Sequence, residues 1–154
     1  MNPSALENLL VTLSTNRIRF ILVGGLAVEL CGHQRATYDV DILLDTETNN
    51  LTHFLETLSQ LGEGYAKELT VDDFDLTEGC ITIHDFDLQL DVFSIMGGKT
   101  YEQLLPYTLT HFVNSDASIL HLNADGLILL KSDSVRPKDQ QDVAALKSIH
   151  RPQN

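Results

Sequence analysis

The chain has no tryptophan, only two cysteines, and fewer than half as many basic as acidic residues. Ten lysines and arginines against 22 aspartates and glutamates give a formal net charge of −12 at pH 7. Because such a surface repels phosphate backbones, unaided tight binding to long DNA or RNA is not expected, and an RNA acceptor is disfavoured. A small nucleotide is not excluded, since bound divalent cations reverse the local sign of the charge.

Long apolar runs and targeting signals are also missing. No apolar run approaches the ~20 residues that span a bilayer, so no membrane segment is expected. The N-terminus lacks the basic start and small-residue cleavage site of a signal peptide. Cys31 and Cys80 stand among apolar residues without CxxC spacing. Both are therefore predicted to be free, buried thiols in a protein of the reducing cytoplasm.

The 154 residues suffice for one domain, 1–154, with a substantial core. Hydrophobic periodicity predicts helices over 4–13, 26–31, 46–61, 100–105, 124–131 and 138–149, and strands over 18–23, 39–44, 80–84, 87–93, 108–113 and 118–122. Strands and helices interleave, but several strands pair as hairpins. The predicted fold class is therefore α/β or α+β, with a mixed β-sheet flanked by helices. The acidic stretch 65–78 does not fit a calcium loop and is interpreted as a solvated loop.

A Gly24-Gly25 pair stands between the first predicted strand and a short helix. Glycine lets the backbone approach a ligand closely, and the free N–H groups at a helix start suit phosphate. Neither the Walker pattern nor the three-glycine dinucleotide fingerprint follows this pair. In isolation, a plain tight turn explains it equally well.

Asp39 and Asp41 open the strand over 39–44 and share one face of it, about 7 Å apart at their Cα atoms. Two carboxylates at that spacing can hold hard cations such as Mg²⁺, whose shell substrate phosphates complete. Asp91, between two apolar residues of a later strand, is the best candidate for a third carboxylate. The simpler alternative is a solvated strand edge, but the preceding glycine turn and the matching later strand favour a site.

Two further segments carry candidate binding residues. Arg35 and Thr37 lie in the loop before Asp39, where the arginine can hold phosphate or form a structural ion pair. Near the C-terminus, basic residues gather in an otherwise acidic chain and include Lys131 and Lys138, followed by Asp139. That cluster can complement triphosphate charge, or it can be an ordinary helix start with an acidic residue near the helix dipole.

Taken in order, these motifs resemble the minimal nucleotidyltransferase fold of the DNA-polymerase-β-like superfamily. That pattern has a small-residue pair opening a helix, then alternating aspartates, then a later single aspartate. It is matched here by Gly24-Gly25, by Tyr38-Asp39-Val40-Asp41-Ile42 and by Leu90-Asp91-Val92. The sequence is most similar to the bacterial branch that contains AbiEii-like toxin nucleotidyltransferases. That branch tends to end as this chain does, with Lys131 and then Arg136-Pro137-Lys138-Asp139-Gln140-Gln141-Asp142-Val143.

The resemblance covers about residues 17–146 and implies transfer of a nucleoside monophosphate from a nucleoside triphosphate to an acceptor hydroxyl. It implies that Asp39, Asp41 and Asp91 are catalytic and bind Mg²⁺, with Asp91 also able to act as a base. The implied nucleotide-binding residues are Gly24, Gly25, Arg35, Thr37, Lys131, Lys138 and Asp139. A toxin–antitoxin role with a partner or antitoxin protein is implied as well.

Two departures from the family pattern leave alternatives open. Many active members have Gly-Ser where this chain has Gly24-Gly25, so a phosphate-binding serine is missing. The chain also has no room for a large acceptor domain. A catalytically inactive module that binds a nucleotide or a partner protein is therefore the main alternative. An unrelated α/β domain with surface aspartates is the third.

Overall fold

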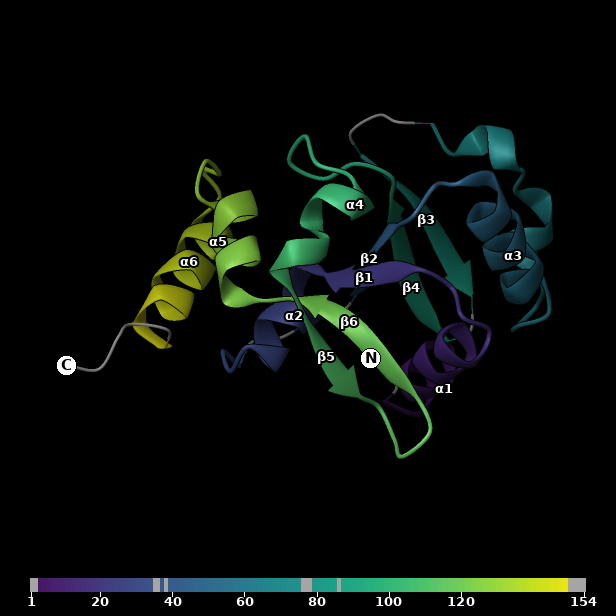
Figure 1. Cartoon of the computed structure of the whole chain (residues 1–154), viewed down its shortest axis with the longest axis horizontal. Helices are drawn as coiled ribbons and strands as arrows, with labels where there is room; N and C mark the ends of the chain where they lie inside the picture. The colour runs from purple at the N-terminus through teal and green to yellow at the C-terminus, as the bar shows by residue number, and fades with distance from the viewer. Residues whose placement is uncertain (1–2, 35–36, 38, 76–78, 86, 150–154) are drawn as a thin grey trace.

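The computed structural model describes residues 3–34, 37, 39–75, 79–85 and 87–149 (Figure 1). These residues form a six-stranded sheet in the order β3-β4-β2-β1-β6-β5, with both parallel and antiparallel neighbours. The predicted mixed sheet flanked by helices is confirmed. The strands are β1 (Phe20–Val23), β2 (Asp39–Leu44), β3 (Cys80–Asp85), β4 (Leu88–Phe93), β5 (Thr108–Phe112) and β6 (Ser118–Leu122).

Helices lie on both sides of this sheet. Figure 1 shows α5 and α6 packed together at one end of the molecule and α3 at the other. The α-helices of the described residues are α1 (Pro3–Thr15), α2 (Gly24–Leu30), α3 (Thr48–Ser59), α4 (Tyr101–Leu104), α5 (Ala124–Lys131) and α6 (Pro137–Ile149). Short 3₁₀ turns follow two of these helices: η1 (Tyr65–Glu68) and η2 (Val71–Asp73) lie between α3 and β3, and η3 (Leu105–Tyr107) lies between α4 and β5.

Strand alternation divides the interior into two cores. On one face of β2, Val40, Ile42 and Leu44 pack with α1 and α3, and β4 adds Leu90 and Val92 to the same core. The opposite face of the sheet packs against α2, α4, α5 and α6. Because the side chains of a strand alternate between faces, Asp39, Asp41 and Asp91 are kept out of the first core and emerge on the second side.

The order of strands at the sheet centre positions the candidate site. β1 runs antiparallel to β2, with Val23 opposite Asp41. β2 runs parallel to β4, with Asp41 opposite Asp91. The chain leaves β1 directly into α2, so Gly24 follows the residue that pairs with Asp41. Residues far apart in sequence are thus brought together at one end of three adjacent strands.

The structure corrects one prediction and refines others. Cys31 and Cys80 are both free, but Cys80 is exposed and Cys31 only half-buried, so the prediction of buried thiols was wrong. Cys80 is exposed because it opens the edge strand β3, on a face that no helix core covers. The predicted loop 65–78 contains η1 and η2, and Asp73 caps η2 by accepting the backbone N–H of Thr70.

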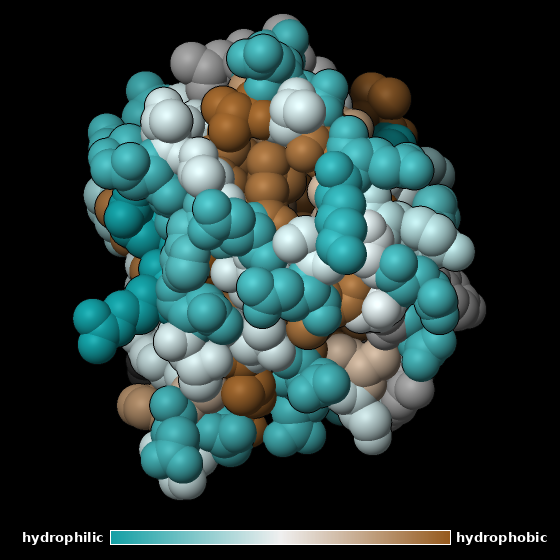
Figure 2. Space-filling model, turned by 90° about the vertical axis from the view of Figure 1, so that its right-hand side faces the viewer, coloured by the Kyte–Doolittle hydropathy of each residue, from teal (hydrophilic) through white to brown (hydrophobic). Residues whose placement is uncertain are grey.

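The surface is in keeping with the composition. The view in Figure 2 shows mostly hydrophilic residues, with apolar residues visible mainly at the floor of hollows. Within the described ranges, every helix is too short or too polar to cross a lipid bilayer.

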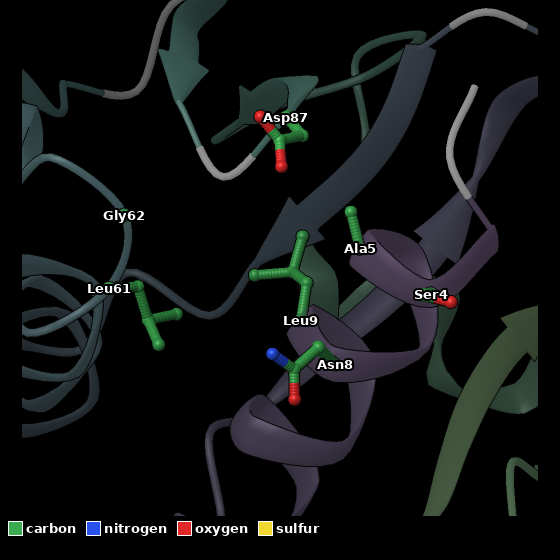
Figure 3. Close-up of a pocket in the computed structure, with 7 residues that line it drawn as sticks. All are labelled: Ser4, Ala5, Asn8, Leu9, Leu61, Gly62 and Asp87. Atoms are coloured by element: carbon green, nitrogen blue, oxygen red, sulfur yellow. The ribbon is translucent and has the colours of Figure 1, made fainter.

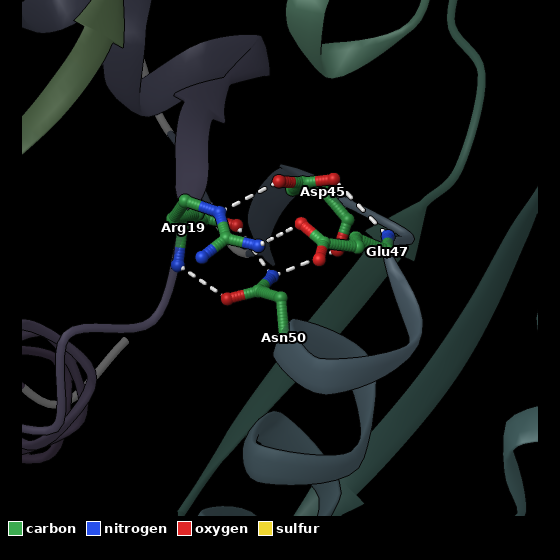
Figure 4. A network of polar contacts seen from close by, with 4 residues as sticks. All are labelled: Arg19, Asp45, Glu47 and Asn50. Atoms are coloured by element: carbon green, nitrogen blue, oxygen red, sulfur yellow. Dashed lines mark hydrogen bonds and ion pairs between the residues drawn. The ribbon is translucent and has the colours of Figure 1, made fainter.

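A polar network joins the start of β1 to the segment after β2 (Figure 4). Arg19 donates to Asp45 Oδ2 and to Glu47 Oε2, each at 2.7 Å. Asn50 is buried at the start of α3, accepts the N–H of Arg19 at 2.8 Å, and donates to the carbonyls of Arg19 and Asp45. The exposed ion pairs contribute little, whereas the buried amide satisfies three backbone groups at once.

We predict that Asn50→Ala lowers the free energy of unfolding by roughly 1–3 kcal/mol, because three partly buried backbone groups lose the side-chain amide that is their partner. Urea unfolding at neutral pH measures the effect. The control is Asn49→Ala, the same change at the exposed neighbouring position, expected to cost less than about 0.5 kcal/mol. Equal costs for the two variants would contradict this role of Asn50.

Candidate active site

One cavity of about 280 Å³ lies at the meeting point of β1, β2, β4 and the α5–α6 pair. Every predicted site residue lines it except Arg35, which falls outside the described residues. The lining residues are Gly24, Gly25, Thr37, Asp39, Asp41, Asp91, Phe93, Lys131, Arg136, Lys138 and Asp139. The structure therefore brings these residues together, while the roles predicted for them remain proposals.

A larger hollow of about 350 Å³ lies between α1 and the end of α3 (Figure 3). In Figure 3, Leu9 approaches it from α1, Leu61 from the segment after α3, and Asp87 from the β3–β4 turn. Among the described residues that line it, Asp87 is the one acidic residue and none is basic. Size alone thus does not identify a site for chemistry, and the smaller cavity has the stronger chemical case.

Gly24 and Asp41 form the tightest contact in the smaller cavity. Gly24 has a φ of +68°, which favours glycine. A Cβ built on it would lie 2.9 Å from Asp41 Cβ and would overlap the Asp41 carboxylate. The Asp41 side chain therefore lies directly against the backbone where β1 turns into α2. This close approach explains why a residue without a side chain opens the helix.

Asp41 and Asp91 lie side by side on adjacent parallel strands. Burial, followed by the charge of Asp91, a hydrogen bond to it, and the charge of Asp39, raises the pKa of Asp41 to about 7. Lys131 acts in the opposite direction. The carboxyl group of Asp41 therefore keeps its proton up to about neutral pH, unless a bound cation displaces that proton.

Asp91 is held in place by two side chains that the sequence did not single out. Thr82 Oγ1, on the neighbouring strand β3, donates to Asp91 Oδ1 at 2.7 Å. The amide of Gln89, two residues before Asp91, donates to both carboxylate oxygens at 3.2 and 3.3 Å. Strand alternation places Gln89 on the face of Asp91, but the contact with Thr82 depends on the β3–β4 register.

Whether these residues fit a metal ion depends on how many carboxylates converge. Among the described residues, no three His, Cys, Asp or Glu side chains come close enough to ligate one ion. The Asp41–Asp91 pair does come into contact. Mg²⁺ is usually held by one or two carboxylates plus substrate phosphates, so the pair fits an ion that arrives with a nucleotide. A closed three-carboxylate cage is not present in this arrangement.

Thr37 adds an independent sign of a polar ligand. Its hydroxyl is buried in the cavity wall and has no hydrogen-bond partner among the described residues. A buried polar atom without a partner costs free energy, so such atoms are rare in folded proteins. A phosphate oxygen or a ligand hydroxyl in the cavity would supply the missing partner.

The cationic wall comes from α5 and α6. Lys131 Nζ lies 2.8 Å from Asp139 Oδ1 and 3.2 Å from the buried Asp142. Burial alone would raise the pKa of Asp139, but hydrogen bonds from Lys131 and Ser134 outweigh it and the pKa lies below its ordinary value. The Asp139 carboxylate thus positions Lys131. Arg136 and Lys138 are exposed at the rim.

Several residues of the site hold other side chains in position, and most of these were not predicted from the sequence. Asp142, which belongs to the C-terminal motif seen in the sequence, holds Lys131. Thr82 and Gln89, which were missed, hold Asp91, and Phe93, also missed, forms an apolar part of the wall. The only signal for them in the sequence was strand alternation, which puts Gln89 and Phe93 on the face of Asp91.

The chain is similar to known proteins in its three-dimensional structure. No family model and no curated protein sequence matches the chain. The crystal structure of the lincosamide antibiotic adenylyltransferase LnuA with lincomycin aligns at a TM-score of 0.60 and 17% identity, over 97% of this chain and 98% of LnuA. The Thermotoga maritima protein TM1012, a provisionally assigned nucleotidyltransferase, aligns at 0.54 and 15%, over 96% and 94%. The chain has the nucleotidyltransferase fold.

We predict that Gly24→Ala destabilises the protein by at least about 3 kcal/mol, from a strained φ and from overlap with Asp41. Gly98→Ala is the matched control, because Gly98 has a φ of +74° and nothing within 4 Å of its added Cβ. It should cost only about 1–2 kcal/mol. Adding Asp41→Ala to Gly24→Ala should recover part of the loss in urea unfolding. The absence of coupling between the two changes would contradict the contact.

A second prediction concerns pH. The pKa of Asp41 is about 7 in the folded protein, above the ordinary 3.8 expected when unfolded. Between these values the folded protein keeps a proton that the unfolded chain has lost, so Asp41 lowers stability as pH rises. Asp41→Asn in EDTA should match the parent near pH 4 and exceed it by a few kcal/mol near pH 8. A pH-independent difference, as expected for Asp116→Asn in the exposed β5–β6 turn, would contradict this.

Proposed function

We propose that the chain is a Mg²⁺-dependent nucleotidyltransferase. It would move a nucleoside monophosphate from a nucleoside triphosphate to an acceptor hydroxyl. The proposal is carried by one observation: a single cavity joins the Asp41–Asp91 pair, the Gly24 turn and the cationic wall of α5 and α6. The nucleotidyltransferase fold and the ordered sequence motifs support it.

In this proposal Asp41 and Asp91 hold magnesium, with Asp39 at the next position of the same strand face. When bound, the ion neutralises phosphate charge and polarises the reacting phosphate. Gly24 and Gly25 let the backbone approach the phosphates, and Thr37 offers its unpartnered hydroxyl. Lys131 and Lys138 face the phosphates, with Lys131 positioned by Asp139. Arg35, in the loop before Asp39, is a further proposed phosphate ligand and lies outside the described residues.

The proposed reaction balances without a redox partner. The acceptor oxygen attacks the α-phosphorus, and the bond between that phosphorus and the bridging oxygen of the leaving pyrophosphate breaks. Asp91 accepts the proton of the acceptor hydroxyl, and the donors Thr82 and Gln89 orient its carboxylate for that step. The group that receives the nucleotide must therefore reach Asp91.

The second candidate is a binding module that has kept the fold and lost catalysis. Two observations favour it. Gly25 stands where many active members have a serine, and no three carboxylates converge among the described residues. Such a module would bind a nucleotide or a partner protein without transferring anything.

The acceptor, a partner protein and the cellular location can also be proposed. LnuA is a lincosamide adenylyltransferase, and this chain covers 98% of it, so a chain of this length can hold both donor and acceptor sites. We propose a small-molecule acceptor, in preference to RNA, because of the net charge of −12. The AbiEii-like motif order supports a toxin–antitoxin role with a partner protein. Two free cysteines fit the cytoplasm.

The test incubates the protein with Mg²⁺ and each labelled nucleoside triphosphate, using lincomycin, total RNA and deproteinised cell extract as probe acceptors. We expect Mg²⁺-dependent label transfer that falls at least about a hundredfold in Asp41→Asn and Asp91→Asn. Asp116→Asn, at an exposed turn, should retain full transfer. Binding of nucleotide without transfer to any acceptor would favour the inactive module, and absence of both would exclude a nucleotide site.

A further inference from the structure

The face of the β3–β4 hairpin beside the cavity is open. On β3 the side chains of Cys80, Thr82 and His84 alternate outward and are exposed. Their partners on β4 are Phe93, Asp91 and Gln89, in that order. In the described part of the chain, the helices that cover the same side of β1, β2 and β6 do not extend over this hairpin, and of its residues Phe93 alone packs against their core. A polar strip of sheet thus continues outward from the catalytic carboxylates.

This strip lies on the side of Asp91 away from the phosphate wall. Lys131 and Lys138 approach the cavity from α5 and α6, which pack on each other, and α5 also packs on α2. β3 is the edge strand at the opposite border of β4. A triphosphate held by the cationic wall would therefore leave the exposed side chains of β3 uncovered. Asp91 itself is buried, and Thr82, on this side, and Gln89 both donate to its carboxylate. The acceptor hydroxyl must reach that side if Asp91 is to take its proton.

The charge of the strip restricts what can bind there. Neither β3 nor β4 contains a lysine or arginine, whereas Asp39, Asp41 and Asp91 lie next to it. Burial and then these three carboxylates raise the pKa of the Cys80 thiol, although Thr82 opposes the effect, so the negative field extends to the strip. A triphosphate brings more negative charge than one magnesium ion removes. The strip thus repels phosphorylated acceptors and attracts cations.

We propose that the open β3–β4 strip, formed by Cys80, Thr82, His84 and Gln89, is the acceptor subsite. It takes a small hydroxyl compound that carries positive charge, such as an amine. This inference rests on the proposed nucleotidyl transfer, because it gives the second substrate of that reaction a location and a charge. Thr82 and Gln89 then have two roles, since they orient Asp91 and border the acceptor.

The first test measures the charge of the strip and does not need an identified acceptor. In a Cys31→Ala background, Cys80 is modified at about pH 8 with methanethiosulfonates that are cationic, neutral or anionic but otherwise alike. The cationic reagent should react at least about tenfold faster than the anionic one, relative to free cysteine. Asp39→Asn should reduce that ratio. An equal or inverted ratio would overturn the proposal.

The second test measures the location of the acceptor. Cys80→Tyr fills the strip and should raise the acceptor KM, or abolish transfer, while Mg²⁺-nucleotide binding changes less than about threefold. Thr110→Tyr, the same bulk on the exposed edge strand β5, should leave both unchanged. Loss of nucleotide binding in Cys80→Tyr, or unaltered transfer, would overturn the location. Failure of nucleotide binding in the parent protein would instead count against the proposed function.

Discussion

The structure depends on the close approach between the backbone at Gly24 and the carboxylate of Asp41. That contact exists because β1 turns directly into α2, and because β2 runs antiparallel to β1 with Asp41 opposite Val23. The parallel pairing of β2 with β4 then places Asp91 beside Asp41. A shift of one residue in either register would turn a carboxylate into the apolar core, so core packing enforces the register that builds the site.

Electrostatic conflict is the second organising feature. Asp41 and Asp91 are in contact, in a chain with a net charge of −12, and one proton satisfies both. Nearby, Lys131 is balanced by Asp139 and Asp142. The carboxyl pair is thus short of a cation, while the buried hydroxyl of Thr37 lacks a partner among the described residues. Magnesium would supply the missing cation to the carboxyl pair, and a nucleotide phosphate would supply a hydrogen-bond partner to Thr37. This is the physical basis for the proposed function.

The site also has two unequal sides. One side is walled by α5 and α6 and carries the cations, whereas the strands β3 and β4 on the other side present exposed polar residues and contain no lysine or arginine. In a reaction that joins a polyanionic donor to an acceptor, such asymmetry separates the two substrates by charge.

The sequence by itself determined the local structure and the chemical composition of the site. The alternation of Asp39 and Asp41 with buried residues predicted β2 to the residue, because period-two patterning is a local property. Gly24 was recognisable as a turn, but its necessity against Asp41 was not. Tertiary structure alone decided that Thr82 holds Asp91, that Cys80 is exposed on an edge strand, and that Asp142 holds Lys131. These facts depend on strand order and helix packing, which bring distant residues together and leave no periodic trace in the chain.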